Sequence, residues 1–399
     1  MSNLFPQSEE SSPDQESMGI IGSMNKELST PPRLVEDHDD LLRLIRQLRS
    51  HKKLAIDTES NSLYAYKEQV CLIQISTPRK DFLLDTIRLT DLSPLGKIMM
   101  DAQVEKVFHG AEYDVICLKR DFNFKINNLF DTRVALRTLG RKRSGLGDVL
   151  EEEFGIKINK KWQRANWGQR PLPPELLDYA RLDTHYLLTL RDRLVKDLKK
   201  CQRWEEAKEE CVRISQFKPN NHDFHPNHFW KISNAKQLQP DQAAILKEIY
   251  LFRDEQARYL NRPPFKVIPD KTLLAVALSK PQNAEDLIEL PGMTRGQIRR
   301  YGQGLLNAVK QGLRSPPPAR PKSEHIDDVI INRYKHLRKW RKQTAEARNV
   351  DSDIILPREI MWSIATEAPR TRKKLHQLMA PLEWRFQQYC NEILEVIQT

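Results

Sequence analysis

The chain has 399 residues, 39% apolar and 30% charged, which is enough for several hydrophobic cores, and no segment has the run of about 18 apolar residues that a membrane helix needs. Its 65 Lys and Arg residues exceed its 54 Asp and Glu residues by 11, which favours a polyanionic partner such as nucleic acid. The five cysteines contain no C-x-x-C pair, which argues against a disulfide framework or a zinc cluster, and with no signal-peptide pattern they predict a cytoplasmic protein.

The N-terminal segment and the residues after it differ sharply in composition. Residues 1–30 are rich in Ser, Glu, Pro and Gln, cannot bury a core and are expected to form a disordered tail. From Val35 to Arg49 an acidic turn leads into an amphipathic pattern, which predicts a helix. Three short apolar runs follow without room for helices between them, which predicts an antiparallel meander with strands at Lys53–Asp57, Gln69–Ser76 and Asp81–Asp85.

Strand and helix patterns alternate in the next segment, which predicts a parallel portion of the sheet. The expected elements are a helix at Leu92–Asp101, a strand at Lys106–His109, a helix at Tyr113–Arg120 and a short strand at Leu129–Phe130. Asp131 is expected to cap the next helix, and Pro174 to begin one long helix that ends near Lys200. The predicted fold class is therefore α/β, with a mixed five-stranded sheet covered by helices.

Two carboxylates, two residues apart, follow the apolar run Leu54–Ile56. In a strand, Asp57 and Glu59 project from the same face, and like charges this close raise each other's pKa. Such a pair is costly unless a cation neutralises it, and carboxylates suit a hard divalent ion such as Mg²⁺ or Mn²⁺. The alternative for this stretch, taken alone, is a polar turn after a strand.

Two further acids stand out by their positions. Asp114 lies at the expected start of a helix, after a strand and the small pair Gly110-Ala111. Asp183 follows Tyr179 by four residues on an expected helix, so that the phenol and the carboxylate share one helix face. Both groups could therefore approach the same ion or water.

These five residues occur in the order of three known sequence motifs. The set Asp57, Glu59, Asp114, Tyr179 and Asp183 resembles the exonuclease motifs of the DEDDy group in the ribonuclease H-like superfamily. Flanking sequences narrow the resemblance to ribonuclease D; they are Cys71–Ile75, Phe108–Ala111, Phe130–Thr132 and Gly145–Leu146. The resemblance covers about Leu34 to Lys200 and continues into the C-terminal half.

The resemblance implies a nuclease that uses two Mg²⁺ or Mn²⁺ ions and releases 5′-mononucleotides stepwise from a 3′ end. Asp57 would bridge the two ions, Glu59 and Asp183 would complete one site, and Asp114 would help to hold the other. Tyr179 would orient the attacking water, since a phenol with a pKa near about 10 is a poor base at neutral pH.

Three other features have two interpretations each. His109 is expected to be packed or hydrogen-bonded, with a position facing the substrate as the alternative. The mixed cations and indoles of Lys160–Arg170 could stack bases and hold phosphate, or could form a loop anchored by its two tryptophans. The H-x-x-H-x-x-H pattern of His222, His225 and His228 resembles a metal site, but no second group of ligands has a suitable spacing, so a linker is favoured.

The C-terminal half contains an internal repeat. Residues 249–309 match residues 337–397 at a constant offset of 88, for example Ala257 with Ala345 and Asn261 with Asn349. A long period with helical apolar spacing predicts two copies of one helical domain. The expected divisions are an exonuclease domain at 31–205, a linker at 206–234, the first copy at 235–313, a Pro-rich linker at 314–325 and the second copy at 326–399.

The first copy, with Asn261–Pro264 and Leu290–Met293, resembles the HRDC domain found in helicases and ribonuclease D. The second copy departs from that pattern at Leu378–Pro381. The resemblance implies nucleic-acid binding, and two copies beside one nuclease domain suggest a ring or clamp around structured RNA. A basic helix face can also be plain solvated surface, which stays the alternative for each copy.

The function expected from the whole sequence is a metal-dependent 3′-to-5′ exoribonuclease, monomeric and without a membrane partner, that acts on precursor tRNA or other structured RNA. A DNA exonuclease is the nearest alternative, because nothing in the sequence indicates how the protein would contact the 2′-hydroxyl that distinguishes RNA from DNA. A helicase motor is excluded, since no G-x-x-x-x-G-K-[ST] loop occurs. A non-catalytic RNA-binding protein with a vestigial site is the second alternative. The presence of all five residues argues against it.

Overall fold

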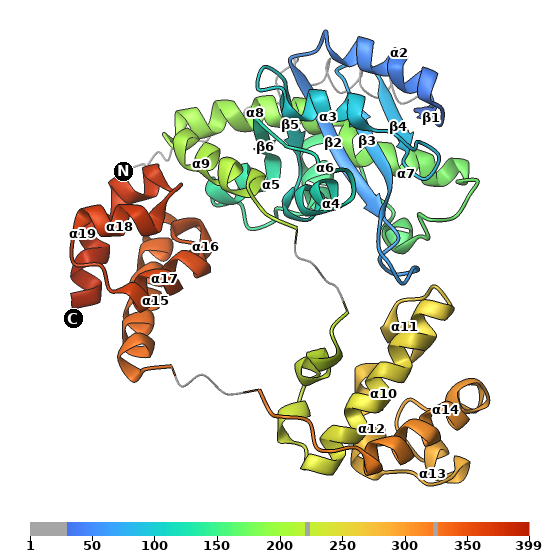
Figure 1. The fold of residues 1–399 in the computed structure, drawn as a ribbon. Helices are drawn as coiled ribbons and strands as arrows, with labels where there is room; N and C mark the ends of the chain where they lie inside the picture. The colour runs from blue at the N-terminus through green and yellow to red at the C-terminus, as the bar shows by residue number, and fades with distance from the viewer. Residues whose placement is uncertain (1–29, 220–223, 322–325, 399) are drawn as a thin grey trace, which may run out of the picture.

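The computed structural model describes residues 30–219, 224–321 and 326–398, which form an N-terminal α/β domain and two helical domains. In Figure 1 the α/β domain lies at the top, the first helical domain (240–314) at the lower right and the second (328–398) at the left. Each helical domain approaches a different part of the α/β domain. The expected disordered tail, residues 1–29, lies outside the described residues.

The sheet has the order β1-β4-β3-β2-β5-β6. The antiparallel meander is confirmed in β2 (Lys53–Ser60), β3 (Val70–Ser76) and β4 (Asp81–Asp85), and β5 (Glu105–Phe108) and β6 (Leu129–Asp131) continue the sheet in parallel. The sheet has six strands where five were expected, because β1 (Arg33–Val35) pairs in parallel with the edge of β4. A run of three residues is too short for alternation to reveal it in the sequence.

Helices cover both faces of the sheet. Leu54 and Ile56 of β2 face a core shared with α2 (His38–Leu48), α3 (Ser93–Met100) and α4 (Glu112–Phe122). Ala55 faces the opposite core, with the helices α5 (Thr132–Thr138), α6 (Leu146–Phe154), α7 (Pro174–His185) and α8 (Leu187–Lys200) on that side. The single helix expected from Pro174 is two helices, because the chain turns at Tyr186, whose buried ring packs under Phe154.

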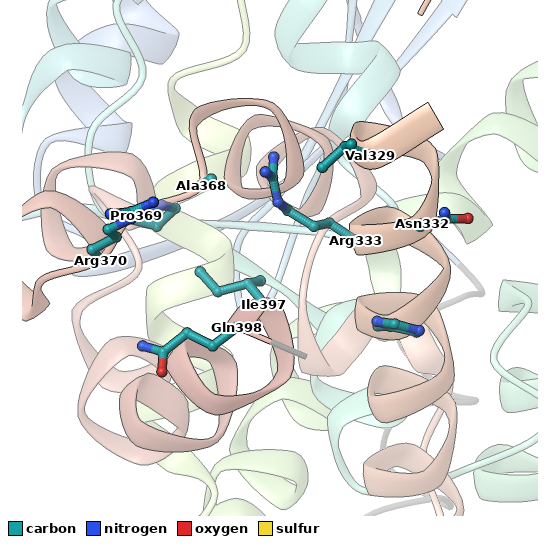
Figure 2. A pocket seen from close by; sticks show the side chains of 9 residues that line it. Val329, Asn332, Arg333, Ala368, Pro369, Arg370, Ile397 and Gln398 are labelled. Atoms are coloured by element: carbon teal, nitrogen blue, oxygen red, sulfur yellow. The ribbon is translucent and has the colours of Figure 1, made fainter. Parts of the chain in front are cut away.

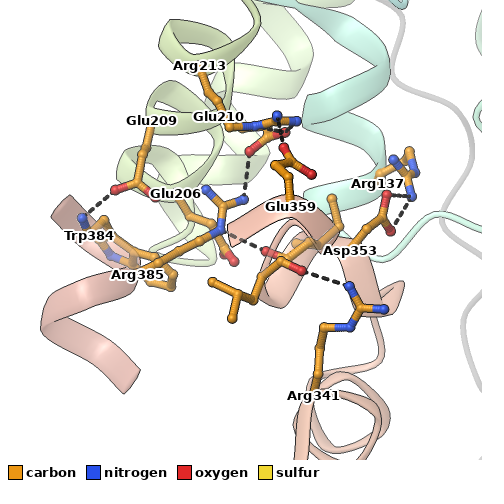
Figure 3. Close-up of polar contacts among 12 residues, drawn as sticks. Arg137, Glu206, Glu209, Glu210, Arg213, Arg341, Asp353, Glu359, Trp384 and Arg385 are labelled. Atoms are coloured by element: carbon orange, nitrogen blue, oxygen red, sulfur yellow. Dashed lines mark hydrogen bonds and ion pairs between the residues drawn. The ribbon is translucent and has the colours of Figure 1, made fainter. Parts of the chain in front are cut away.

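The segment expected to be a linker begins with a packed helix, α9 (Trp204–Ser215). Its Glu206 side chain is 0% exposed and pairs with Arg348 of the second helical domain at 2.6 Å. Glu209 pairs with Arg385, also 0% exposed, at 2.7 Å (Figure 3). The acidic face of α9, which looks solvent-exposed in the sequence, is therefore the surface on which the second helical domain docks.

The two helical domains confirm the repeat element by element. The first contains α10 (Pro240–Tyr259), α11 (Pro264–Val267), α12 (Asp270–Ser279), α13 (Ala284–Ile288) and α14 (Arg295–Arg314). The second contains α15 (Asp328–Arg348), α16 (Ser352–Ile355), α17 (Arg358–Glu367), α18 (Arg372–Met379) and α19 (Glu383–Gln398). The bounds of α11 and α16, and of α12 and α17, differ by the same 88 positions as the sequences.

The first helical domain contacts the loop that follows β2. The hydroxyl of Tyr66 donates to Asp254 at 2.7 Å, and the backbone N–H of Tyr66 donates to Asn261 at 3.2 Å. The ammonium of Lys266 lies 3.9 Å from the ring centre of Tyr64. The strand that carries the predicted acids is thus connected directly to this helical domain.

No helix among the described residues is long and apolar enough to cross a membrane.

The histidine pattern and the five thiols lie in different parts of the structure. His225 caps a short 3₁₀ helix (Pro226–Lys231) by accepting from the N–H of Asn227, and no metal group containing a histidine occurs within the described ranges, while His222 lies outside them. All five cysteines are free.

Candidate active site

Three of the predicted acids meet at the end of β2. Asp57, Glu59 and Asp183 each offer one carboxylate oxygen, and these oxygens lie within 4.8 Å of one another. Asp57 and Glu59 come from the same face of β2, as the two-residue spacing predicts, and α7 lies over that face and contributes Asp183. Residues separated by more than 120 positions in the sequence therefore form one cluster.

The shape of the sheet leaves this end of β2 open. β2 pairs with β5 only as far as Ala55, whereas its pairing with β3 continues to Ser60. Beyond Phe108 the chain leaves β5 and turns at Gly110, which has a φ of +80° that favours glycine. This turn starts α4, and the first turn of α4 brings Asp114 to the open side of β2.

Asp114 lies beside the cluster of three acids. It accepts a hydrogen bond of 2.5 Å from the hydroxyl of Thr58, the residue between Asp57 and Glu59. Its charge is the second largest cause, after burial, of the raised pKa of Asp57 and Asp183. The structure thus places Asp114 within electrostatic reach, although it is not one of the three acids whose oxygens lie within 4.8 Å.

The pKa values of all four acids are raised. Burial is the first cause in each case, and it raises the pKa of Asp183 to about 7 and that of Asp114 to about 6. Burial, followed by the charges of Asp114 and Asp183, raises the pKa of Asp57 and of Glu59 well above their usual values. Neighbouring buried carboxylates resist ionisation together, and binding of a divalent cation would favour their charged forms.

A pH-dependent stability difference is expected from Asp183 in metal-free protein. Its pKa rises from 3.8 unfolded to about 7 folded, so the folded state binds more protons between these values, and this group lowers stability as the pH rises from about 4 to about 7. Asp183→Asn should therefore raise the melting temperature by several degrees at pH 8 in chelator, and by less at pH 5. Melting curves of both proteins at the two pH values measure this, and an equal gain at both would contradict it.

Tyr179 lies on α7 one turn before Asp183, as predicted. Its side chain is 7% exposed and its ring centre lies 6.3 Å from that of Trp167. Burial, and then the charges of Asp183, Glu59 and Asp57, raise the pKa of the phenol above its usual value of 10. The hydroxyl therefore stays protonated at neutral pH, where it can donate a hydrogen bond but cannot act as a base.

Gln74, to which the sequence analysis gave no role, lies on the same face as the acids. It is the antiparallel partner of Asp57 on β3, so the two side chains project together from the sheet. The side chain is 0% exposed, and neither its amide nitrogen nor its amide oxygen has a hydrogen-bond partner among the described residues. The sequence gives no sign of this role, because Gln74 is a single polar residue within the otherwise mostly apolar strand Val70–Ser76.

We expect Gln74 to position the Asp57 carboxylate by donating to it when the acids are ionised. Second-sphere partners of this kind typically contribute about 10- to 100-fold to metal affinity or activity. Gln74→Leu should therefore weaken Mn²⁺ binding, measured by calorimetry, by about tenfold or more. Gln69→Leu changes an exposed glutamine just outside β3 and should bind Mn²⁺ normally. Equal Mn²⁺ affinities for the two variants would remove Gln74 from the site.

Asp131 is confirmed as a helix cap. It is 0% exposed and accepts from the backbone N–H groups of Arg133 and Val134 at the start of α5. It also accepts from Gly110 at 2.9 Å and Ala111 at 2.7 Å, which ties the turn before α4 to β6. This second set of bonds, invisible in the sequence, helps to hold Asp114 in place.

His109 is hydrogen-bonded, as the first of its two interpretations predicted. Its Nδ1 lies 2.9 Å from the hydroxyl of Thr132, and burial lowers its pKa to about 4. In the loop after α6, Trp167 is buried and Arg170 pairs with the buried Asp85 at 2.5 Å, which anchors that end of the loop. The ammonium of Lys161 lies 4.6 Å from the ring centre of the half-buried Trp162.

The donor set fits a divalent metal. The three clustered groups supply only carboxylate oxygens, which are hard ligands of the kind that Mg²⁺ and Mn²⁺ prefer. Burial and then the charges of the neighbouring acids raise the pKa values of these groups. A bound divalent cation would lower them again. Asp57, Glu59 and Asp183 are therefore the residues that would hold an ion, with Asp114 beside them.

Two family profiles match the chain. A 3′-5′ exonuclease family matches residues 32–199, and the HRDC domain family matches residues 242–309 and 331–397. Exosome complex component 10 of Rattus norvegicus is 32% identical over 286 residues, which are 67% of this chain and 32% of the relative. Exosome complex exonuclease RRP6 of Saccharomyces cerevisiae is 30% identical over 299 residues, 71% of this chain and 41% of the relative. The chain thus spans less than half of the length of either relative.

Two solved structures extend the comparison. The catalytic core of RRP6 from Trypanosoma brucei has 28% identity and a TM-score of 0.64, and the match covers 75% of this chain and 88% of that one. RNase D of Escherichia coli, described as an exoribonuclease involved in structured RNA processing, has 23% identity and a TM-score of 0.67 over 92% of this chain and 99% of that one. The second match supports the fold alone.

Proposed function

Because this chain has a 3′-5′ exonuclease domain followed by two HRDC domains, we propose that it is a metal-dependent 3′-to-5′ exoribonuclease. The observation that carries the proposal is the group of Asp57, Glu59 and Asp183 within 4.8 Å at the open end of β2. Such a cluster suits phosphodiester hydrolysis, in which negative charge grows on the attacking and leaving oxygens.

The residues divide the work as follows. Asp57, Glu59 and Asp183 would hold the ions as carboxylates, with Asp114 beside them, and Mg²⁺ or Mn²⁺ bound there would activate a water and stabilise the leaving 3′ oxygen. The protonated Tyr179 hydroxyl orients that water by a hydrogen bond. The retained Asp114 and Tyr179 favour an active enzyme over a vestigial site, because binding alone needs neither of them.

The substrate we propose is RNA with a free 3′ end, with precursor tRNA as one such substrate. The net charge of +11 suits a polyanion, and the resemblance of the five site residues and their flanking sequences to ribonuclease D supports RNA. Five free cysteines are consistent with a reducing compartment such as the cytoplasm. A DNA exonuclease is the second candidate, because carboxylate-held ions act on the phosphodiester, which RNA and DNA share.

The test is hydrolysis of a 3′-extended tRNA and of a matched DNA strand by the purified chain, with Mg²⁺ and with chelator. We expect 5′-mononucleotides to be released one at a time from the RNA, and chelator to stop the release. Release that persists in excess chelator would reject the metal-dependent site. Faster hydrolysis of the DNA strand than of the RNA would reject RNA as the substrate in favour of DNA.

A further inference from the structure

The second HRDC domain has a basic pocket at one end, of about 570 Å³ (Figure 2). It lies between the first turns of α15, the turn that joins α17 to α18, and the end of α19. Its lining residues are Val329, Asn332, Arg333, His336, Ala368, Pro369, Arg370, Ile397 and Gln398. Two of these are arginines, one is a histidine and none is acidic.

The first HRDC domain is closed at the equivalent place. Ile245, which corresponds to Arg333 at the offset of 88, is 0% exposed. Asp241 and Lys280 form an ion pair across the same end.

The charge of this end also differs between the two domains. In the first domain, Glu248 of α10 accepts a hydrogen bond from Gln311, and the position equivalent to Arg370 is Gln282. In the second domain, the position equivalent to Glu248 is His336. The second domain thus has more positive charge and an open pocket at positions where the first has an acid and a packed core.

Arg333 is held in place at the pocket. One of its N–H groups donates to the carbonyl of Ala365 at 3.1 Å, near the end of α17. A guanidinium has five donors in a planar fork, so donors remain for an anion, and the fork suits a phosphate. Arg370 is exposed at the rim. Two guanidinium groups and no carboxylate around one pocket favour a phosphate ligand.

The pocket and the nuclease domain lie at opposite ends of the second HRDC domain. Arg348 at the end of α15 and Arg385 at the start of α19 contact α9, whereas the pocket includes the start of α15 and the end of α19. The 15 residues from Arg333 to Arg348 span about 22 Å of helix. The nucleotide being cleaved cannot reach the pocket, but another part of the same RNA can.

We propose that this pocket binds a backbone phosphate in the body of the RNA, away from the 3′ end that is being cleaved. The proposal rests on the exoribonuclease function above. Because about 22 Å of helix separates the pocket from the contact with the nuclease domain, only an RNA that extends well beyond its cleaved 3′ end can engage the pocket. The second HRDC domain then selects long or structured RNAs, while short RNAs are cleaved without it.

The test compares two pocket variants with a matched control in the full chain. Arg333→Gln/Arg370→Gln removes both guanidinium groups, Arg370→Gln alone changes only an exposed side chain, and Arg358→Gln removes an exposed arginine at the other end of α17. Affinity for a 3′-extended hairpin RNA is measured at several salt concentrations in an Asp57→Asn background, so that binding is read without hydrolysis. Turnover of a tetranucleotide is measured with Asp57 intact.

We expect the double variant to bind the hairpin RNA about tenfold or more weakly, with the salt dependence reduced by about one to two ions, and Arg370→Gln to show about half of that reduction. Arg358→Gln should bind normally, and tetranucleotide turnover should be equal in all proteins. Hairpin binding by the double variant that equals the Arg358→Gln control would overturn the proposal. The proposal would also be overturned if the double variant lost affinity for a 5′-mononucleotide, inorganic phosphate or an acidic peptide but kept its affinity for the hairpin RNA. Absence of tetranucleotide cleavage in the unmodified chain would instead reject the proposed function and leave the binding result to stand.

Discussion

Asp57→Asn is expected to slow RNA hydrolysis by about a thousandfold or more while RNA affinity changes by less than about twofold. A thousandfold loss corresponds to about 4 kcal/mol of transition-state stabilisation, which is the scale of a lost metal ligand. Asp57 is at the centre of the cluster, since the charges of Asp114, Asp183 and Glu59 all act on it. Single-turnover hydrolysis and filter binding of one RNA measure the two quantities.

The control for this variant is Asp178→Asn, which makes the same chemical change on an exposed carboxylate of α7. It should hydrolyse RNA at nearly the normal rate. Unfolding cannot explain a loss at Asp57, because removing one of several repelling acids should raise the melting temperature of the metal-free protein. Normal turnover by Asp57→Asn, or an equal loss in both variants, would reject the assigned site.

Arg385→Ala is expected to release the second HRDC domain from the nuclease domain. The Arg385 side chain is 0% exposed and pairs with Glu209 at 2.7 Å and Glu210 at 3.0 Å, so its loss leaves buried carboxylates without a cation (Figure 3). Removing one partner of a buried ion pair typically costs about 3 to 5 kcal/mol. We expect a lower melting temperature and faster proteolytic cleavage between the two domains.

Arg372→Ala is the matched control, because Arg372 lies in the same domain but is exposed, where it hydrogen-bonds to Asn391 and lies over the ring of Phe386. It should change the melting temperature by little. Adding Glu209→Gln to Arg385→Ala should recover part of the loss, since one uncompensated charge is removed. If Arg385→Ala and Arg372→Ala melt alike and resist protease alike, the interface is not held by this arginine.

The candidate site residues could be proposed from the sequence because the signal for them is local. The two-residue spacing of Asp57 and Glu59 and the four-residue spacing of Tyr179 and Asp183 each place a pair on one face of one element. The apolar runs before and around them predicted the strands and helices, since burial imposes a period on each element. The offset of 88 predicted the two helical domains in the same way.

Other features depend on pairs of residues that lie far apart in the sequence. The helix α9 was expected to be part of a linker, but its Ala207 and Ile214 pack in the cores of the α/β domain. Its acidic residues Glu206 and Glu209 find their partners Arg348 and Arg385 only in the second helical domain. Gln74 had no assigned role, because only the register of β3 against β2 places it opposite Asp57. In both cases the partner is supplied by tertiary contacts.

The sequence by itself determined the fold class, the repeat and the five residues of the proposed active site, because each follows from the periodicity of one segment or the order of short motifs. Only the tertiary structure decided that Asp57, Glu59 and Asp183 share one cluster within 4.8 Å, that α9 docks the second HRDC domain, and that this domain has an open basic pocket. The physical reason is that electrostatic repulsion, ion pairing and packing depend on distances in space, which a spacing along the chain does not report.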